Sequence, residues 1–266
     1  VIDQCEAARI VLRDGAAVGV ETTDGRRFEA RAVVSTLDPE QTFLRLLDEK
    51  SLPGDLGPAV RGWEWEERTM FGLHLGLRGG VGWKGRDPRI ADSMIVFCGL
   101  ETEDELHEHL RRLDAGEERD CAWLHVTIPT RFDATMAPAG QHLLRAEAVV
   151  RYDAPWKEQG AAFGDSCIRL LQEYADLGEI VFRRETTPLD IEAKLTTMKR
   201  GSIKHGAYTP LQMGYLRPND LCSRNETPIR GLFVGGASTY PGGMILGAPG
   251  FLAAGVVGEF LATTPD

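Results

Sequence analysis

Residues 231–262 read GLFVGGASTYPGGMILGAPGFLAAGVVGEFLA, and their glycine content sets them apart from the rest of the chain. Eight glycines follow Gly231 in this stretch, whereas the whole chain of 266 residues has 30. Glycine is entropically costly inside helices and strands, so such a cluster needs positive φ angles or a close backbone approach. The order of a buried strand, a glycine loop and a helix beginning near Pro249 predicts backbone N–H groups that receive an anionic or polarised ligand. The alternative is a tight strand-to-helix turn whose glycines serve packing alone.

The overall composition is that of an ordinary globular protein, with 42% hydrophobic and 26% charged residues. The length predicts about two domains. The net charge of −10 argues against nucleic acid or anionic lipid as a partner. No apolar run reaches the roughly 18 residues of a membrane span, and no signal peptide opens the chain. We therefore expect a cytoplasmic protein without an integral membrane segment.

The cysteines and histidines predict no metal site. The 5 cysteines are scattered and never spaced C-x-x-C, and the 6 histidines form no H-E-x-x-H pair. This pattern excludes a dithiol pair of thioredoxin type and a cysteine zinc cluster, and it favours a reducing compartment.

The first part of the chain predicts a β-meander with strands at 9–12, 17–22 and 28–36. Asp14-Gly15 and Asp24-Gly25 separate these runs, and Asp-Gly between apolar runs is a strong hairpin signal. A helix is then expected from Asp38, the residue suited to its N-cap.

The middle of the chain alternates strands and helices without a strict βαβ rhythm. Strands are expected at 69–78, 94–98, 122–128 and 142–152, and helices at 102–113, 160–175 and 189–195. In the helix at 102–113, Thr102 and Glu105 form a capping-box pattern, and Leu106, Leu110 and Leu113 form the apolar stripe. This organisation predicts an α+β unit on a mixed or antiparallel sheet.

Two segments offer weaker candidates for a substrate site. In strand 69–78, one face carries Gly72, His74 and Gly76, and the missing side chains leave room for a ligand or for a packed helix. The irregular segment 196–230 contains Lys204, His205 and Tyr208, and a long irregular stretch is usually functional or wrapped around a site. His205 is the candidate catalytic residue, although a lone loop histidine is more often solvated or hydrogen-bonded.

Three familiar motifs are excluded. GVGWKG at 80–85 matches G-x-G-x-x-G, but Pro88 blocks the helix that a dinucleotide-binding turn must open. Gly242 to Gly247 has P-loop spacing, but Ala248 stands where lysine is required. Ser238 lacks the second glycine of a nucleophile elbow.

The tail resembles the C-terminal flavin-contact motif of bacterial phytoene desaturases and of the phytoene-dehydrogenase-like oxidoreductases related to pyridine nucleotide-disulphide oxidoreductase domain proteins. The similarity continues through AVGVETTDGRRFEARAVVSTLDPEQTFLRLL, IPTRFDATMAPAGQHLL and DIEAKLTTMKRGSIKHGAYTPLQMGYLRP, which occur in the family's order. The resemblance implies FAD as the cofactor. It places the following residues beside the pyrophosphate, ribityl chain and ring of FAD: Gly235, Gly236, Ala237, Ser238, Thr239, Pro241, Gly242, Gly243, Gly247, Ala248, Pro249 and Gly250.

The resemblance also implies a domain organisation. Residues 1–60 and 228–266 would form a partial FAD-binding, Rossmann-like domain, and residues 61–227 a substrate-binding domain. The family opens with a strand, G-x-G-x-x-G and a helix that hold ADP, and this chain has none of them. We therefore expect the missing N-terminal FAD-binding half to be a partner, and this chain alone to be inactive and to hold FAD poorly or not at all.

The reaction that the resemblance implies is removal of hydride from a small, largely apolar substrate. Two alternatives stay open at this point. One is an amine-oxidase-like flavoenzyme on the same scaffold, and the other is a non-catalytic binding or dimerisation module. A homo-oligomer is compatible with either alternative.

Overall fold

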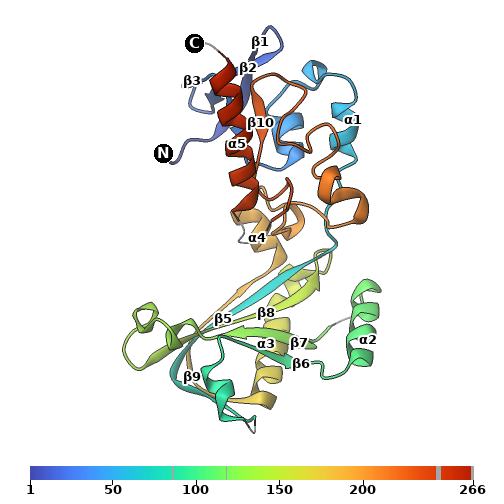
Figure 1. Ribbon diagram of the computed structural model, residues 1–266. Helices are drawn as coiled ribbons and strands as arrows, with labels where there is room; N and C mark the ends of the chain where they lie inside the picture. The colour runs from blue at the N-terminus through green and yellow to red at the C-terminus, as the bar shows by residue number, and fades with distance from the viewer. Residues whose placement is uncertain (86, 118, 244–246, 265–266) are drawn as a thin grey trace. The chain divides into compact units, whose positions relative to one another are not determined.

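The computed structural model describes residues 1–85, 87–117, 119–243 and 247–264 (Figure 1). The chain divides into two compact units. Unit 1 comprises Val1–Glu66 and Leu195–Asp266, and unit 2 comprises Glu67–Lys194. Residues 61–66 and 195–227 therefore belong to the same unit as the glycine-rich tail, whereas the resemblance placed both in the substrate-binding domain at 61–227. The assignment of cofactor and substrate to the two units stays a prediction.

Unit 1 combines small sheets with short helices. Its strands are β1 (Ala7–Arg13), β2 (Ala16–Thr22), β3 (Arg27–Glu29), β4 (Val33–Ser35) and β10 (Leu232–Val234). Its helices are α1 (Leu56–Arg61), α5 (Ala248–Thr263), the π-helix η1 (Gln41–Arg45), and the 3-10 helices η2 (Glu49–Ser51), η6 (Lys199–Gly201), η7 (Pro210–Gln212) and η8 (Gly214–Leu216).

Strands β1, β2 and β3 form the predicted antiparallel meander. Gly15 at φ 76° and Gly25 at φ 84° occupy its turns, as the Asp-Gly pairs indicate. The prediction of one continuous third strand at 28–36 is wrong. β3 ends at Glu29 and is exposed, whereas β4 buries Val33 and Ser35 and pairs in parallel with β10. The two halves of the run pair with different strands, β3 with β2 and β4 with β10, so they belong to different sheets.

The core of unit 1 joins residues from both ends of the sequence. Phe43 and Leu56 pack with Cys222 and Leu232 in one buried cluster. The helix expected from Asp38 is a short turn that contains η1, and Gln41 N donates to Asp38 Oδ1 at 2.9 Å as an N-cap would require.

Unit 2 is a sheet covered on one face by a helix. Its strands are β5 (Arg68–Trp83), β6 (Ile95–Gly99), β7 (Trp123–Thr127), β8 (Gln141–Arg151) and β9 (Ala175–Thr186). Its helices are α2 (Glu103–Asp114), α3 (Trp156–Tyr174), α4 (Pro188–Lys194), and the 3-10 helices η3 (Pro88–Asp92), η4 (Pro129–Arg131) and η5 (Ala134–Met136). The strand order is β6-β7-β8-β5-β9, with antiparallel neighbours throughout.

The alternation in β5 explains how α3 covers this sheet. Phe71, Leu73, Leu75 and Leu77 are fully buried on one face, and α3 packs its own apolar residues into the same cluster. Figure 1 shows the ribbon of α3 along this sheet. Phe71 lies against the rings of two α3 residues, Trp156 and Phe163. The alternation of aliphatic and other residues in β5 thus correctly predicts a strand with one buried face, and the predicted mixed or antiparallel sheet is antiparallel.

Strand β9 and the contacts of α2 differ from the prediction. β9 was not expected, because it continues directly from α3 without a turn signal and leaves Ile180, Val181 and Phe182 exposed. The capping box of α2 is confirmed, since Thr102 and Glu105 exchange both hydrogen bonds. Its predicted stripe is only partly correct: Leu113 is buried, but Leu106 is 44% exposed and His109 is buried instead.

The GVGWKG segment runs through the end of β5, and a 3-10 helix begins at Pro88. Gly80 and Gly82 lie within β5, so the first two glycines of the motif are in a strand and not in a phosphate-binding turn, which agrees with its exclusion. None of the described helices combines the length and the apolar character needed to cross a membrane.

Candidate functional site

The first candidate element is the N-terminus of α5. Gly247 precedes the helix with φ 63°, and no side chain caps the helix. Gly247 and Gly250 are exposed, and an added Cβ at either position would meet nothing within 4 Å. The first N–H groups of a helix have no intrahelical partners, and the helix dipole favours negative charge there by about 0.3–1 kcal/mol. This end of α5 can therefore receive an electronegative ligand on its main chain.

Four other glycines of the tail lie against the protein itself. An added Cβ would stand 3.2 Å from Ala253 Cβ at Gly235 and 2.8 Å from Thr36 O at Gly236. At Gly242 and Gly243 it would stand 2.3 Å from Tyr208 Oη and 2.8 Å from Lys204 Cα. These glycines permit close packing of the loop, so the packing alternative accounts for them without a ligand. The tail thus contains packing glycines and open glycines.

Two polar residues of the glycine loop, Ser238 and Thr239, point into the protein, whereas Tyr240 is exposed. Ser238 and Thr239 are buried, and their hydroxyls donate to Leu37 O at 3.3 Å and to Gly236 O at 2.9 Å. Ala237 and Pro241 are half-buried. Residues 244–246 of the tail lie outside the described residues. The two hydroxyls therefore stabilise the loop conformation.

The structure brings the loop at 204–208 into direct contact with the tail. Tyr208 Oη donates to Gly243 O at 3.2 Å. Lys204 forms an ion pair with Glu66, and its Nζ lies 4.5 Å from the centroid of the Tyr208 ring. The candidate substrate residues Lys204 and Tyr208 are thus neighbours of the candidate cofactor residues Gly242 and Gly243.

His205 is buried and has a left-handed backbone with φ 54°. Among the described residues, its Nδ1 has no hydrogen-bond partner. Burial lowers the pKa of His205 below its ordinary value, and the positive charge of Arg217 lowers it further. The imidazole is therefore neutral near pH 7, which suits a hydrogen-bonding role better than a charged one.

Arg217 is a candidate that the sequence patterns did not indicate. It is fully buried, and its guanidinium donates to main-chain carbonyls, among them Ala237 O at 3.0 Å and Lys204 O at 2.8 Å. Burial lowers the pKa of Arg217 to about 10, so the group keeps its charge at neutral pH. A single arginine before Pro218 in an irregular segment carries no local signal of burial.

In unit 2, Gly72, His74 and Gly76 lie on the face of the sheet opposite the aliphatic residues that α3 covers. The cross-strand partners are Thr186 at Gly72 and Phe182 at Gly76, with the Phe182 Cβ only 3.0 Å from an added Cβ at Gly76. The predicted alternative of a helix packed on this face does not apply to α3. These glycines make room for cross-strand side chains.

The same face is partly apolar and partly charged. Phe97 is 68% and Phe182 52% exposed. His125 Nδ1 lies 3.3 Å from Glu147 Oε2. Burial, followed by the charge of Arg145, lowers the pKa of His74, which therefore stays neutral near pH 7. The face combines apolar surface with an uncharged imidazole.

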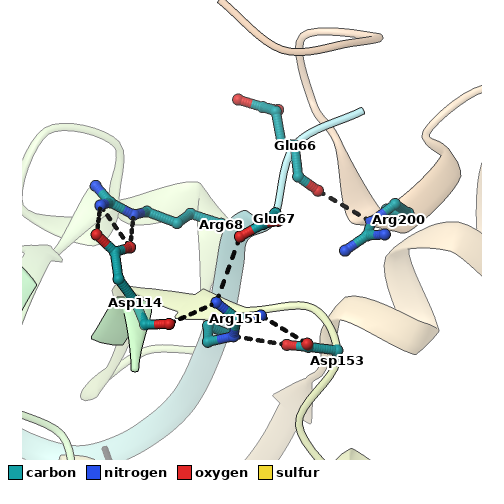
Figure 2. Close-up of polar contacts among 7 residues, drawn as sticks. All are labelled: Glu66, Glu67, Arg68, Asp114, Arg151, Asp153 and Arg200. Carbon is teal, nitrogen blue, oxygen red and sulfur yellow. Dashed lines mark hydrogen bonds and ion pairs between the residues drawn. The ribbon is translucent and has the colours of Figure 1, made fainter. Parts of the chain in front are cut away.

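Charged residues at the ends of β5 and β8 form a structural network within unit 2 (Figure 2). Arg68 forms a bidentate ion pair with Asp114 at 2.6 Å, and Arg151 pairs with Asp153 at 2.6 Å while donating to Asp114 O at 3.0 Å. In unit 1, Arg200 Nε donates to Glu66 O at 3.1 Å (Figure 2). A hollow of about 330 Å³ adjoins Arg151. Because the charges are already paired with one another, this network gives no reacting group.

The edge of β4 is the last feature of unit 1 with room for an occupant. In the described chain β4 pairs only with β10, so the N–H and C=O of Val34 point away from that partner. A hollow of about 380 Å³ adjoins this strand, lined by Val33, Val34, Ile10 and Val20 among others. Polar residues such as Gln41 and Arg45 also line this hollow. A partly apolar hollow beside an unpaired strand edge suits an additional strand.

Comparison with known proteins agrees with the family resemblance of the tail. No family model matches the chain. One of the subunits of limonene dehydrogenase from Castellaniella defragrans is 40% identical over 293 residues, covering 100% of this chain and 53% of that protein. Pyridine nucleotide-disulfide oxidoreductase domain-containing protein 2 from Mus musculus is 26% identical, covering 93% of this chain and 45% of that protein. The zeta-carotene-forming phytoene desaturase from Myxococcus xanthus is 30% identical, covering 88% of this chain and 43% of that protein.

The solved structures support the fold. An oxidoreductase from Methanosarcina mazei has a TM-score of 0.53 and 17% sequence identity, covering 96% of this chain and 49% of that chain. At this identity the likeness concerns the fold alone. The chain spans about half the length of the curated relatives it matches.

Proposed function

We propose that this chain, a homologue of the phytoene-desaturase-like oxidoreductases, forms part of an FAD-dependent oxidoreductase that removes hydride from a largely apolar substrate. The observation that carries the proposal is the N-terminus of α5, which follows a glycine loop, has no side-chain cap and is bordered by two exposed glycines. FAD, when bound, supplies the acceptor for the hydride.

The residues of unit 1 fit such a cofactor in two ways. Within the described residues, the main-chain N–H groups of Ala248 and Gly250 have no main-chain acceptor, and Pro249 between them has no N–H. The positive N-terminal end of the α5 dipole would stabilise negative charge that develops on a bound electron acceptor. The buried hydroxyls of Ser238 and Thr239 hold the preceding loop, so its main chain is organised before a ligand arrives.

The apolar substrate class is supported by unit 2 and by the relatives. The names limonene dehydrogenase and phytoene desaturase refer to hydrocarbons. The face that carries His74 also exposes Phe97 and Phe182, and covering apolar surface contributes about 25 cal/mol per Å². His74 itself adds no charge to this face, whose charged residues beside it are its cross-strand partners Arg145 and Arg184. We therefore assign hydrocarbon binding to this face.

The partner that we propose is the ADP-binding half of the same flavoprotein. The chain spans about half the length of the curated relatives it matches. The free edge of β4 and the hollow beside it would accept a parallel strand from that half. Parallel sheets are normally covered on both faces, which a two-stranded pair cannot achieve alone.

The proposal is tested by FAD uptake and by reduction of the bound flavin. The complete flavoprotein that contains this chain is purified, and its flavin is quantified per protein molecule. It is then mixed anaerobically with limonene as a hydrocarbon substrate, or with putrescine as a polar amine. We expect bound FAD that limonene bleaches and putrescine does not. A complete protein that takes up no FAD would refute the assignment, and bleaching by putrescine alone would favour an amine oxidase.

A further inference from the structure

Arg217 is the largest fully buried side chain in the part of the chain that the structure describes. Across those residues no carboxylate forms an ion pair with Arg217, although the negative charge of Glu66 raises the pKa of Arg217 without direct contact. Removing an ionised group from water costs several kcal/mol unless it is paired or fully hydrogen-bonded. A charge retained in this position needs an explanation beyond packing.

The guanidinium is satisfied by main-chain carbonyls from separate segments. Nη2 donates to Lys204 O at 2.8 Å, and Nη1 donates to Ala207 O at 3.3 Å and Gln212 O at 3.2 Å. Ala237 O accepts from both Nη2 at 3.0 Å and Nε at 3.3 Å. Arg217 therefore ties the loop at 204–212 to the glycine tail.

The guanidinium lies close to two aromatic rings. Its central carbon lies 5.1 Å from the centroid of Trp63 and 4.7 Å from the centroid of Tyr208. Such cation–π contacts favour the charged form and fix the plane of the group. Tyr208 in turn donates to Gly243 O, so the same cluster contacts the tail at residues 237 and 243.

We propose that Arg217 is a positioning residue of the flavin site: it holds the 237–243 loop and supplies a permanent positive charge that favours the anionic reduced flavin. This inference rests on the proposed function. A positive charge in a poorly polarisable interior acts over a longer range than one in water. It stabilises an anion more than a neutral group, so it raises the flavin reduction potential. A lysine could keep the charge but could not reproduce the fork of five hydrogen bonds.

The test uses the complete flavoprotein with variants R217K and R217M, and with R230M as the matched control. Arg230 is an exposed arginine of the same unit. The readouts are the flavin midpoint potential, the FAD dissociation constant and thermal unfolding of the apoprotein. We expect R217M to lower the potential and to weaken FAD binding by about ten- to hundredfold, the loss expected for charge-assisted hydrogen bonds. R217K should keep the potential and weaken FAD binding, and R230M should change neither.

Two results would overturn the inference. One is an R217M protein that is less stable but has the wild-type potential, because a purely structural role predicts that pattern. The other is an R217K protein whose potential falls although its charge is kept, and this second variant decides the question if R217M does not fold. A wild-type protein that binds no FAD would instead refute the proposed function itself, so the two failures are distinguishable.

Discussion

The substitution Gly250→Ala tests whether this glycine leaves room for FAD, because the added methyl group should stabilise the helix but weaken FAD binding. Gly250 lies in the first turn of α5, is exposed, and has no atom within 4 Å of the position of an added Cβ. Alanine is favoured over glycine in a helix by about 0.5–1 kcal/mol. For a chain of this size, that gain raises the unfolding temperature by roughly 1–4 °C.

The same methyl group should weaken FAD binding if the backbone at Gly250 lies against the flavin. Overpacking of a close contact costs about 1–3 kcal/mol, which corresponds to roughly a 5- to 150-fold higher dissociation constant. Gly258 is the matched control, because it belongs to the same helix and is equally open. The unfolding temperature is measured on the complete flavoprotein without FAD, and the dissociation constant is measured by titrating the same protein with FAD. Gly258→Ala should stabilise the protein without affecting FAD. Equal FAD affinities for the two variants would refute the proposed close approach.

Three further predictions concern packing, substrate and pH. Gly236→Ala should destabilise the protein more than Gly15→Ala in urea unfolding. Both positions have left-handed backbones, which cost alanine about 1–2 kcal/mol, but only at Gly236 would the added Cβ stand 2.8 Å from a backbone oxygen. Equal losses of stability would contradict the packing role of Gly236. Phe182→Asp should raise the KM for a hydrocarbon about tenfold or more, because covering a phenylalanine contributes about 1.5–3 kcal/mol. The control Leu106→Asp, at an exposed position of α2, should leave this KM unchanged. An unchanged KM for Phe182→Asp would show that Phe182 does not contact the substrate. Burial lowers the pKa of His205, so the folded state disfavours its protonation, and the free energy of unfolding should fall as the pH drops below about 6.5. His205→Gln should reduce that dependence while His107→Gln, at an exposed position, should not, and urea midpoints at several pH values check both.

Local patterns predicted the elements that depend on neighbouring residues. The Asp-Gly turns of the meander, the Thr102 capping box and the alternation of β5 are each decided within a few positions. The same local logic could not separate β3 from β4, because both halves of 28–36 are strand-forming and only their partners differ. β9 escaped prediction for a related reason: it is an edge strand whose partner β5 lies about a hundred residues earlier.

The candidate site divides in the same way. The tail pattern predicts a glycine loop followed by a helix from about Pro249, and α5 begins there at Ala248. Which glycines are open and which are filled depends on Tyr208, Lys204 and Thr36, none of them within the loop. Arg217 was missed because its burial depends on carbonyls contributed by distant segments.

Short-range patterns were enough to establish the order strand, glycine loop and helix, the meander turns and the family resemblance, since periodicity, caps and turn residues act over a few positions. Long-range packing was needed to establish that β4 pairs in parallel with β10 and that Gly247 and Gly250 are open while Gly242 and Gly243 are packed. It was also needed to establish that the Arg217 guanidinium is buried close to two aromatic rings. The physical reason is that burial and hydrogen bonding depend on contacts between segments that are far apart in the sequence, and local patterns do not predict those contacts.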